Sequence, residues 1–355
     1  MKSDEGKRGQ QGSRRPRQAS SSKRDRVVDL VTGGTSGIGI RLIQALLDRG
    51  DEVRVLVQEH PNTNPDWKRL PPKIIPYVAD LKLQREGEYK MIKEACRGAD
   101  NIFHLAAATA RIKADFDEYI NSNVIGTENL LKACVEANPD ATDIHFIYIS
   151  TTAVYGNSRK GEVITEESET SPSGPYGESK LMAEQVIKSF TDVHQGIKYT
   201  IARVATMYGP YYEWSFFKLF KGLVERKMPY IGNGQNHITL IHIDDVVDCF
   251  LAFTEKPQSA NKIFNLTDGR SYTLKGLLDK AAEFLNVPPP ARAMHPAILK
   301  LGAKMFGLNK EEVDFLTSDR VVSIDKLKEA LNFIPSRSID EDGKQMADDF
   351  LERQK

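Results

Sequence analysis

Tyr176 and Lys180 lie four positions apart in the segment SGPYGESKLMAE, residues 173–184, where Pro and Gly give way to strong helix formers. Side chains at this spacing are neighbours on one face of a helix. A free tyrosine ionises near pH 10, so its phenol is too weak a base at neutral pH by roughly 4 kcal/mol, and a nearby ammonium favours the phenolate. The pair predicts an acid/base tyrosine that exchanges the proton of an alcohol. The alternative is an exposed Tyr and Lys on a surface helix.

Three hydroxyl side chains, Ser150, Thr151 and Thr152, lie at the end of a strand predicted at residues 144–150. Ligands of open parallel sheets bind outside the carboxyl ends of the strands, so a hydroxyl there can orient a reacting oxygen towards the phenol. The alternative is that these residues only cap loose backbone groups. The chain has no G-x-S-x-G motif, which argues against a hydrolase serine.

A glycine-rich turn, LVTGGTSGIGIRL at residues 30–42, joins the first predicted strand to a helix predicted at 38–49. Glycines at 33, 37 and 39 allow a tight turn and a close approach of the backbone to a ligand. A helix N-terminus there offers unpaired N–H groups to a pyrophosphate. The turn predicts a dinucleotide site, with a purely structural turn as the alternative.

The choice of dinucleotide depends on the end of the second strand, where an acid favours NAD and an Arg favours NADP. The chain has Val57, Gln58 and Glu59 there, and Glu59 lies beyond the predicted end of the strand, far from the expected position of the acid. We expect NAD, with NADP left open. Asp80, after the third strand, can receive an adenine amino group or can be a turn or cap residue.

The elements that must position these residues alternate between short apolar runs and helical stretches, which is typical of a parallel sheet covered on both faces. Six strands are predicted, at 26–31, 52–57, 73–78, 101–106, 144–150 and 198–204. The pattern predicts an α/β fold with a doubly wound parallel (Rossmann) sheet and a smaller, mainly helical C-terminal substrate region. The predicted division is a tail at 1–26, a dinucleotide-binding domain at 27–207 and 236–268, and a substrate-binding region at 208–235 and 269–355.

Composition restricts the class of protein further. The chain has 355 residues, 40% hydrophobic and 28% charged, with a net charge of zero. No apolar run reaches the roughly 18 residues of a membrane span. Cys96, Cys134 and Cys249 are odd in number and lack CxxC spacing, which predicts reduced thiols and a cytoplasmic protein.

The net charge is unevenly spread along the chain. Residues 1–26 hold nine Lys or Arg against three acidic residues and almost no apolar ones, which predicts a disordered basic arm. Contact with nucleic acid or an acidic membrane is the less favoured interpretation of this arm.

Together the motifs resemble the extended short-chain dehydrogenase/reductase family, which contains nucleotide-sugar epimerases, dehydratases and 3β-hydroxysteroid dehydrogenases. The similar segments cover nearly the whole chain from Val27 onward. In order they are TGGTSGIG, ADL, DNIFHLAAA, NVIGTENLL, FIYISTTAVYG, PYGESKLMAE, RVATMYGP and GNGQNHITLIHIDDVV.

The resemblance implies a catalytic Thr151, an acid/base Tyr176, and a Lys180 that lowers the tyrosine pKa and holds the nicotinamide ribose. His104 is expected to be structural. His242, Asp244 and Asp245 are expected to form a strand-to-helix junction, so no metal is predicted. The expected cofactor-binding residues are Gly33, Ser36, Gly37, Ile38, Gly39, Asp80, Leu81, Leu105, Ala106, Ala107, Asn123, Tyr176 and Lys180.

Several residues depart from the family pattern. Ser36 stands where extended members usually have a glycine. Thr152 and Ala153 replace the acidic pair of the dehydratase branch and argue against a 4,6-dehydratase. Thr206 replaces a frequent Asn. The Arg that clamps a diphosphate near the GNG segment in relatives is missing, and His237 and Ile238 lie in that neighbourhood. Both changes weaken the nucleotide-sugar interpretation.

Three functions remain open. The favoured one is an NAD(P)-dependent epimerase acting on a nucleotide sugar. The second is a 3β-hydroxysteroid or related dehydrogenase, suggested by the missing clamp and the apolar stretch at 297–308, which can equally be a core helix. The third, a non-catalytic NAD(P)-binding regulator, is less favoured. By analogy a homodimer is expected through helices at 116–137 and 176–190.

Overall fold

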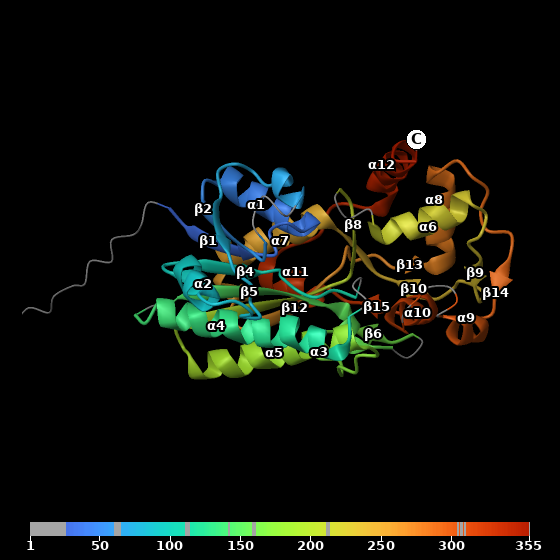
Figure 1. Cartoon of the computed structure of the whole chain (residues 1–355). Helices are drawn as coiled ribbons and strands as arrows, with labels where there is room; N and C mark the ends of the chain where they lie inside the picture. Colours follow the sequence, from blue (N-terminus) through green and yellow to red (C-terminus); the bar gives the residue numbers. More distant parts are fainter. Residues whose placement is uncertain are drawn as a thin grey trace, which may run out of the picture.

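The structure is a computed structural model in which a parallel sheet carries helices on both faces and a helical region lies beyond one end (Figure 1). The predicted basic arm lies outside the described residues, except for Arg26. The described residues are 26–59, 65–110, 114–140, 143–157, 161–210, 214–303, 305, 308 and 310–354.

The main sheet has seven strands in the order β12-β7-β5-β4-β1-β2-β3, and every neighbouring pair is parallel. All six predicted strands are present, so the predicted fold class is confirmed. β12 was not predicted as a strand, because its sequence, KIFNL, is short and carries Lys and Asn. The strands are β1 Val28–Thr32, β2 Glu52–Val57, β3 Ile75–Val78, β4 Asn101–His104, β5 Ile144–Thr151, β7 Ile197–Val204 and β12 Lys262–Leu266.

Helices cover the two faces of this sheet in two separate apolar clusters. One face packs against α1 Gly37–Arg49, α7 Ile243–Glu255 and α11 Asp325–Leu331, and the other against α2 Glu88–Cys96, α4 Gly126–Ala137 and α5 Pro175–Val193. The chain runs from β1 to β3 and then returns to β4 on the other side of β1. This reversal places a ligand crevice at the carboxyl ends of β1 and β4.

The remaining helices form a third apolar cluster at the far end of the molecule (Figure 1). Four short strand pairs surround and connect it: β8 Thr206–Tyr208 with β11 Leu240–His242, β9 Tyr230–Ile231 with β14 Ala293–Met294, β10 His237–Ile238 with β13 Tyr272–Thr273, and β6 Val163–Ile164 with β15 Val321–Val322. The helices are α6 Trp214–Val224, α8 Leu274–Phe284, α9 Pro296–Gly302, α10 Lys310–Thr317 and α12 Ile339–Glu352.

The apolar stretch at 297–308 contributes Leu299, Ala303 and Leu308 to the third apolar cluster, so the core interpretation holds for part of it. Within it, α9 ends at Gly302, and Leu299 is buried whereas Leu301 is 90% exposed.

Candidate active site

The glycine turn brings the ends of β1 and β4 into direct contact. Gly33 has a left-handed backbone with φ +70°, and a Cβ atom there would lie 2.7 Å from the Ala106 nitrogen. A Cβ atom on Gly39 would lie 2.5 Å from the Gly33 carbonyl oxygen. Both positions therefore require glycine, and the turn stays narrow enough for a ligand to reach the start of α1.

Ser36 has a local role that explains why it replaces a glycine here. It is the N-cap of α1: its Oγ accepts a hydrogen bond from the Gly39 nitrogen at 3.1 Å and donates one to the Gly33 carbonyl at 2.7 Å. Gly37 and Ile38 then form the first turn of the helix. A serine N-cap satisfies one of the free N–H groups and leaves the others for a ligand.

A chain of buried hydrogen bonds runs from β1 to α4 through His104. Thr32 Oγ1 accepts from the Ala106 nitrogen at 3.1 Å and lies 2.8 Å from His104 Nδ1. His104 Nε2 lies 2.9 Å from Thr127 Oγ1, which donates to the Asn123 carbonyl at 2.6 Å. This pattern assigns the proton to Nε2. Burial lowers the pKa of His104 to about 3, with Lys180 as a second cause, so the ring is neutral and structural.

Asn123 lies in a π-helical segment, η2 Ile120–Ile125, between α3 Phe116–Tyr119 and α4. Its side chain accepts from the Ala108 nitrogen at 2.7 Å and donates to the Ala108 carbonyl at 3.0 Å and to Ser179 Oγ at 2.9 Å. The amide thus connects the loop after β4 to α5, one residue before Lys180. π-Helical turns often occur at functional sites because they redirect one side chain.

The three predicted catalytic residues come from two elements, β5 and α5, that contact each other. Thr151 is the last residue of β5 and the N-cap of the 3₁₀ turn η3 Thr152–Tyr155. Tyr176 is the second residue of α5, and a Cβ atom on Gly177 would lie 3.0 Å from the Ala153 carbonyl. The first turn of α5 therefore packs against η3, beside Thr151.

Lys180 is buried, with 1% of its surface exposed, and its Nζ has no hydrogen-bond partner among the described residues. The Nζ lies 4.0 Å from the centroid of the Tyr148 ring, a cation–π geometry. Burial lowers the pKa of Lys180 to about 7, and the Glu184 carboxylate opposes this shift. A buried ammonium with unused donors is suited to a ligand that brings hydroxyl groups.

Glu184, which sequence reasoning missed, lies one helical turn after Lys180. It forms a buried ion pair with Arg203 of β7 at 2.7 Å and accepts a hydrogen bond from Ser150 Oγ at 2.5 Å. These contacts fix α5 against the ends of β5 and β7. The available signal was the acid four positions after Lys180, on the same helix face.

Asp80, the residue expected near the adenine, lies in a local hydrogen-bond network. One oxygen of its carboxylate accepts from Gln58 Nε2 at 2.7 Å, and the other accepts from the Lys82 nitrogen at 2.9 Å. The neighbouring Leu81 is buried, and its carbonyl accepts from Asn129 Nδ2 at 2.8 Å. The Gln58 amide thus lies beside Asp80 at the end of β2, where the ribose contact was expected.

The residues considered for a metal form the predicted strand-to-helix junction instead. His242 is the N-cap of α7, and its Nδ1 accepts from the Asp244 nitrogen at 3.2 Å. Asp244 pairs with Arg41 at 2.7 Å, and Asp245 pairs with Arg337 at 2.7 Å. Across the described part of the chain, no group of three or more His, Cys, Asp or Glu side chains is placed to hold a metal ion.

A doubly wound sheet, a glycine turn at its switch point and a Tyr/Lys pair beside it define a nicotinamide dinucleotide-dependent oxidoreductase. The model of the NAD dependent epimerase/dehydratase family matches residues 30–267. The chain belongs to this family, as the resemblance predicted, and it is an NAD-dependent enzyme.

The chain is similar to proteins that are named for different activities. UDP-glucose 4-epimerase of Vibrio cholerae is 26% identical over 91% of this chain and 95% of its own length. A putative dihydroflavonol 4-reductase of Synechocystis sp. is 30% identical over 73% of each chain. The solved UDP-glucose 4-epimerase of Thermotoga maritima, in complex with UDP-glucose, has a TM-score of 0.75 at 23% identity and covers 93% of this chain and all of its own.

Two features of this chain fit NAD. The cradle at Gly33 and Gly39 has no room for a Cβ atom and leads to the N-terminus of α1, where a pyrophosphate is favoured. The Nζ of Lys180, which no described residue hydrogen-bonds, offers donors that ribose hydroxyls can accept. The predicted cofactor, NAD, is therefore confirmed by the family and matched by the site.

Proposed function

We propose that the protein epimerises a carbinol centre of a nucleotide sugar by removing and returning a hydride. The observation that carries this proposal is the buried ammonium of Lys180, which lies 4.0 Å from the Tyr148 ring, one helical turn after Tyr176, and has no hydrogen-bond partner within the ranges that the structure describes. The relatives named UDP-glucose 4-epimerase and UDP-glucuronate 4-epimerase support a nucleotide sugar as the substrate.

In this proposal Tyr176 takes the proton from the alcohol oxygen and later returns it. The Thr151 hydroxyl hydrogen-bonds the same oxygen and orients it towards the phenol. Lys180, when charged, favours the phenolate and holds the nicotinamide ribose. Bound NAD supplies the hydride acceptor and, in its reduced form, the donor.

The other cofactor-binding residues are proposed by their place along the crevice. The pyrophosphate lies over the glycine turn, the adenosine lies beside Asp80 and Leu81, and the nicotinamide side runs along the loop after β4. In that order the proposed residues are Gly33, Ser36, Gly37, Ile38 and Gly39, then Asp80 and Leu81, then Leu105, Ala106, Ala107 and Asn123.

A second candidate is a dehydrogenase or reductase of an apolar alcohol or ketone. His237 and Ile238 lie in the neighbourhood where the family resemblance implies a diphosphate-binding Arg. Ile238 is only 2% exposed and packs in the third apolar cluster, and His237 Nδ1 lies 2.8 Å from Asp319 Oδ1. Ile238 offers no charge to a diphosphate. The 30% identical relative named as a putative dihydroflavonol 4-reductase supports this candidate.

Incubation of the protein with NAD and UDP-glucose or UDP-glucuronate is expected to give the 4-epimer with no net change in nicotinamide absorbance. Proton NMR of the sugar measures this outcome, because the axial and equatorial products differ in their couplings. Steady formation of NADH with sterols or other apolar alcohols, and no epimer from any nucleotide sugar, would instead establish the second candidate. The Tyr176→Phe variant controls for contaminating activity.

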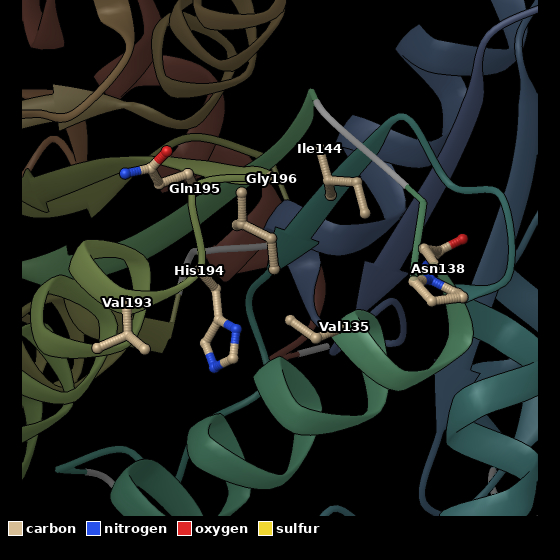
Figure 2. Close-up of a pocket in the computed structure, with 9 residues that line it drawn as sticks. Val135, Asn138, Ile144, Val193, His194, Gln195 and Gly196 are labelled. Carbon is tan, nitrogen blue, oxygen red and sulfur yellow. The ribbon is translucent and has the colours of Figure 1, made fainter.

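We propose that the protein forms a homodimer through α4 and α5. The outer face of these helices exposes Val193 to 76% and includes a hollow of about 250 Å³ at their C-terminal ends (Figure 2). The His194 ring lies against Phe190, with centroids 4.3 Å apart, at the edge of this hollow. A second copy would cover these apolar groups.

The double change Ser189→Glu and Val193→Glu is expected to convert the dimer to a monomer. The two residues lie one turn apart on the exposed face of α5, so the added charges would face each other across a two-fold axis. Light scattering after size-exclusion chromatography measures the mass. Ile334→Glu, at an apolar residue that is 66% exposed elsewhere, is the matched control and should keep the dimer. A wild-type monomer at micromolar concentration would contradict the proposal.

We propose a cytoplasmic location, in agreement with the cysteine usage. Cys96, Cys134 and Cys249 are all buried free thiols. A reducing compartment preserves such thiols. Separately, none of the described helices combines the length and apolar character needed to cross a membrane.

A further inference from the structure

The segment that begins with α9 exposes large apolar side chains to solvent. Leu301 is 90% exposed, Met305 80% and Ile298 56%, and the first two are the most exposed large hydrophobic residues in the described parts of the chain. Single exposed apolar residues are normal, but three within eight positions form a patch. Figure 1 places α9 at the opposite end of the molecule from β1 and β2.

The fold holds this patch in place. Leu299 is 4% exposed and anchors the inner side of α9 in the third apolar cluster. His295 caps the helix, with its Nδ1 accepting from the Ala297 nitrogen at 3.2 Å, and the preceding β14 pairs with β9. Ile298 and Leu301, three positions apart, therefore share the outer side while Leu299 faces inward.

The segment of chain that carries the patch holds only positive charges, and acidic residues resume at Glu311 and Glu312 on α10. Residues 286–310 contain four basic residues and no Asp or Glu, although residues 27–355 hold 40 Lys or Arg against 46 Asp or Glu. Arg292 and Lys300 of this segment are exposed, and Lys300 lies next to Leu301 in the chain. Apolar side chains flanked by cations on a short helix are typical of segments that lie in the interface of an anionic membrane.

We propose that α9 and Met305 form a peripheral contact with an anionic lipid surface. Ile298, Leu301 and Met305 enter the headgroup and acyl boundary, and Arg292 and Lys300 contact the lipid phosphates. One such contact gives reversible binding, and a second basic signal strengthens it. Residues 1–26, with a surplus of six positive charges, can provide that second signal.

Flotation with lipid vesicles tests the proposal on the full chain with NAD. At low salt we expect binding to vesicles of phosphatidylcholine mixed with phosphatidylglycerol at least about tenfold tighter than to phosphatidylcholine alone. The variant Leu301→Asp/Met305→Asp should lose at least about tenfold of this affinity, because the buried apolar area is lost and like charges repel. The matched control is Val163→Asp/Ile334→Asp, at residues that are 53% and 66% exposed elsewhere, and it should bind like the wild type.

Three results would overturn the proposal. The first is a wild-type protein that does not float with anionic vesicles. The second is unchanged binding by the Leu301/Met305 variant while deletion of residues 1–25 abolishes it, which would assign the contact to the arm. The third is a loss of oligomer mass in the Leu301/Met305 variant, which would show that the patch packs against another copy. Epimer formation by this variant in solution should equal that of the wild type.

Discussion

Replacement of Tyr176 by Phe is expected to lower kcat by about 10²- to 10⁴-fold, the usual contribution of a positioned acid/base group. The change removes one oxygen atom from a half-buried ring at the start of α5 and leaves the glycine turn and Lys180 in place. Affinity for NAD should therefore change little. Initial rates and a titration of NAD by tryptophan fluorescence or calorimetry measure the two effects separately.

Tyr119→Phe is the matched control for this variant. Its ring centroid lies 6.3 Å from that of Tyr176, and its hydroxyl donates to the Thr109 carbonyl at 3.3 Å, so it shares the neighbourhood without the proposed proton transfer. We expect less than a few-fold loss of kcat. Turnover by Tyr176→Phe at the wild-type rate would show that another group moves the proton.

Replacement of Lys180 by Met is expected to reduce activity about 10²- to 10⁴-fold and to stabilise the NAD-free protein by about 1–3 kcal/mol. The Nζ is buried without a hydrogen-bond partner among the described residues, so its removal relieves an unfavourable desolvation. Met keeps most of the volume. Urea unfolding without NAD measures the stability, and Lys188→Met, at an exposed position on the same helix, should alter neither property.

The dependence of stability on pH should identify the Lys180 ammonium as the cause. Burial lowers the pKa of Lys180 from 10.5 to about 7 in the folded protein. Between these values the unfolded chain binds a proton that the folded chain does not, so the free energy of unfolding rises with pH. Below pH 7 both the folded and the unfolded chain bind the proton, so the full cost of burying the charged ammonium lowers the free energy of unfolding. The rise in the free energy of unfolding between about pH 7 and pH 10.5 should be missing from Lys180→Met. If the variant is less stable than the wild type at every pH, the contact with Tyr148 outweighs the desolvation.

The identities of the catalytic candidates and the fold class could be predicted because their signals are local. Tyr176 and Lys180 lie on one helix, and Gly33 and Gly39 lie in or next to one turn. The local backbone geometry therefore determines their relative positions from their separation in the sequence. The alternation of apolar strands with helices predicted the sheet for the same reason. Within the main sheet only β12, a short strand at the edge, escaped this pattern, and the eight strands of the short pairs, two or three residues each, lie outside the six predicted strands.

The setting of those residues could not be predicted, because it joins segments far apart in the chain. Lys180 meets the face of Tyr148, Glu184 pairs with Arg203, and the Asn123 amide connects Ala108 to Ser179. Each contact depends on the order in which β4, β5 and β7 lie side by side. The pKa of Lys180 depends on how deeply that packing buries it.

The sequence by itself determined which side chains can exchange a proton and where a dinucleotide can approach, since both depend on residue type and short-range geometry. The tertiary structure decided that the Lys180 ammonium is buried with no hydrogen-bond partner in the described part of the chain, and that α9 keeps an apolar face in solvent. Burial is a property of the whole packed chain, because it is set by which distant segments cover a residue.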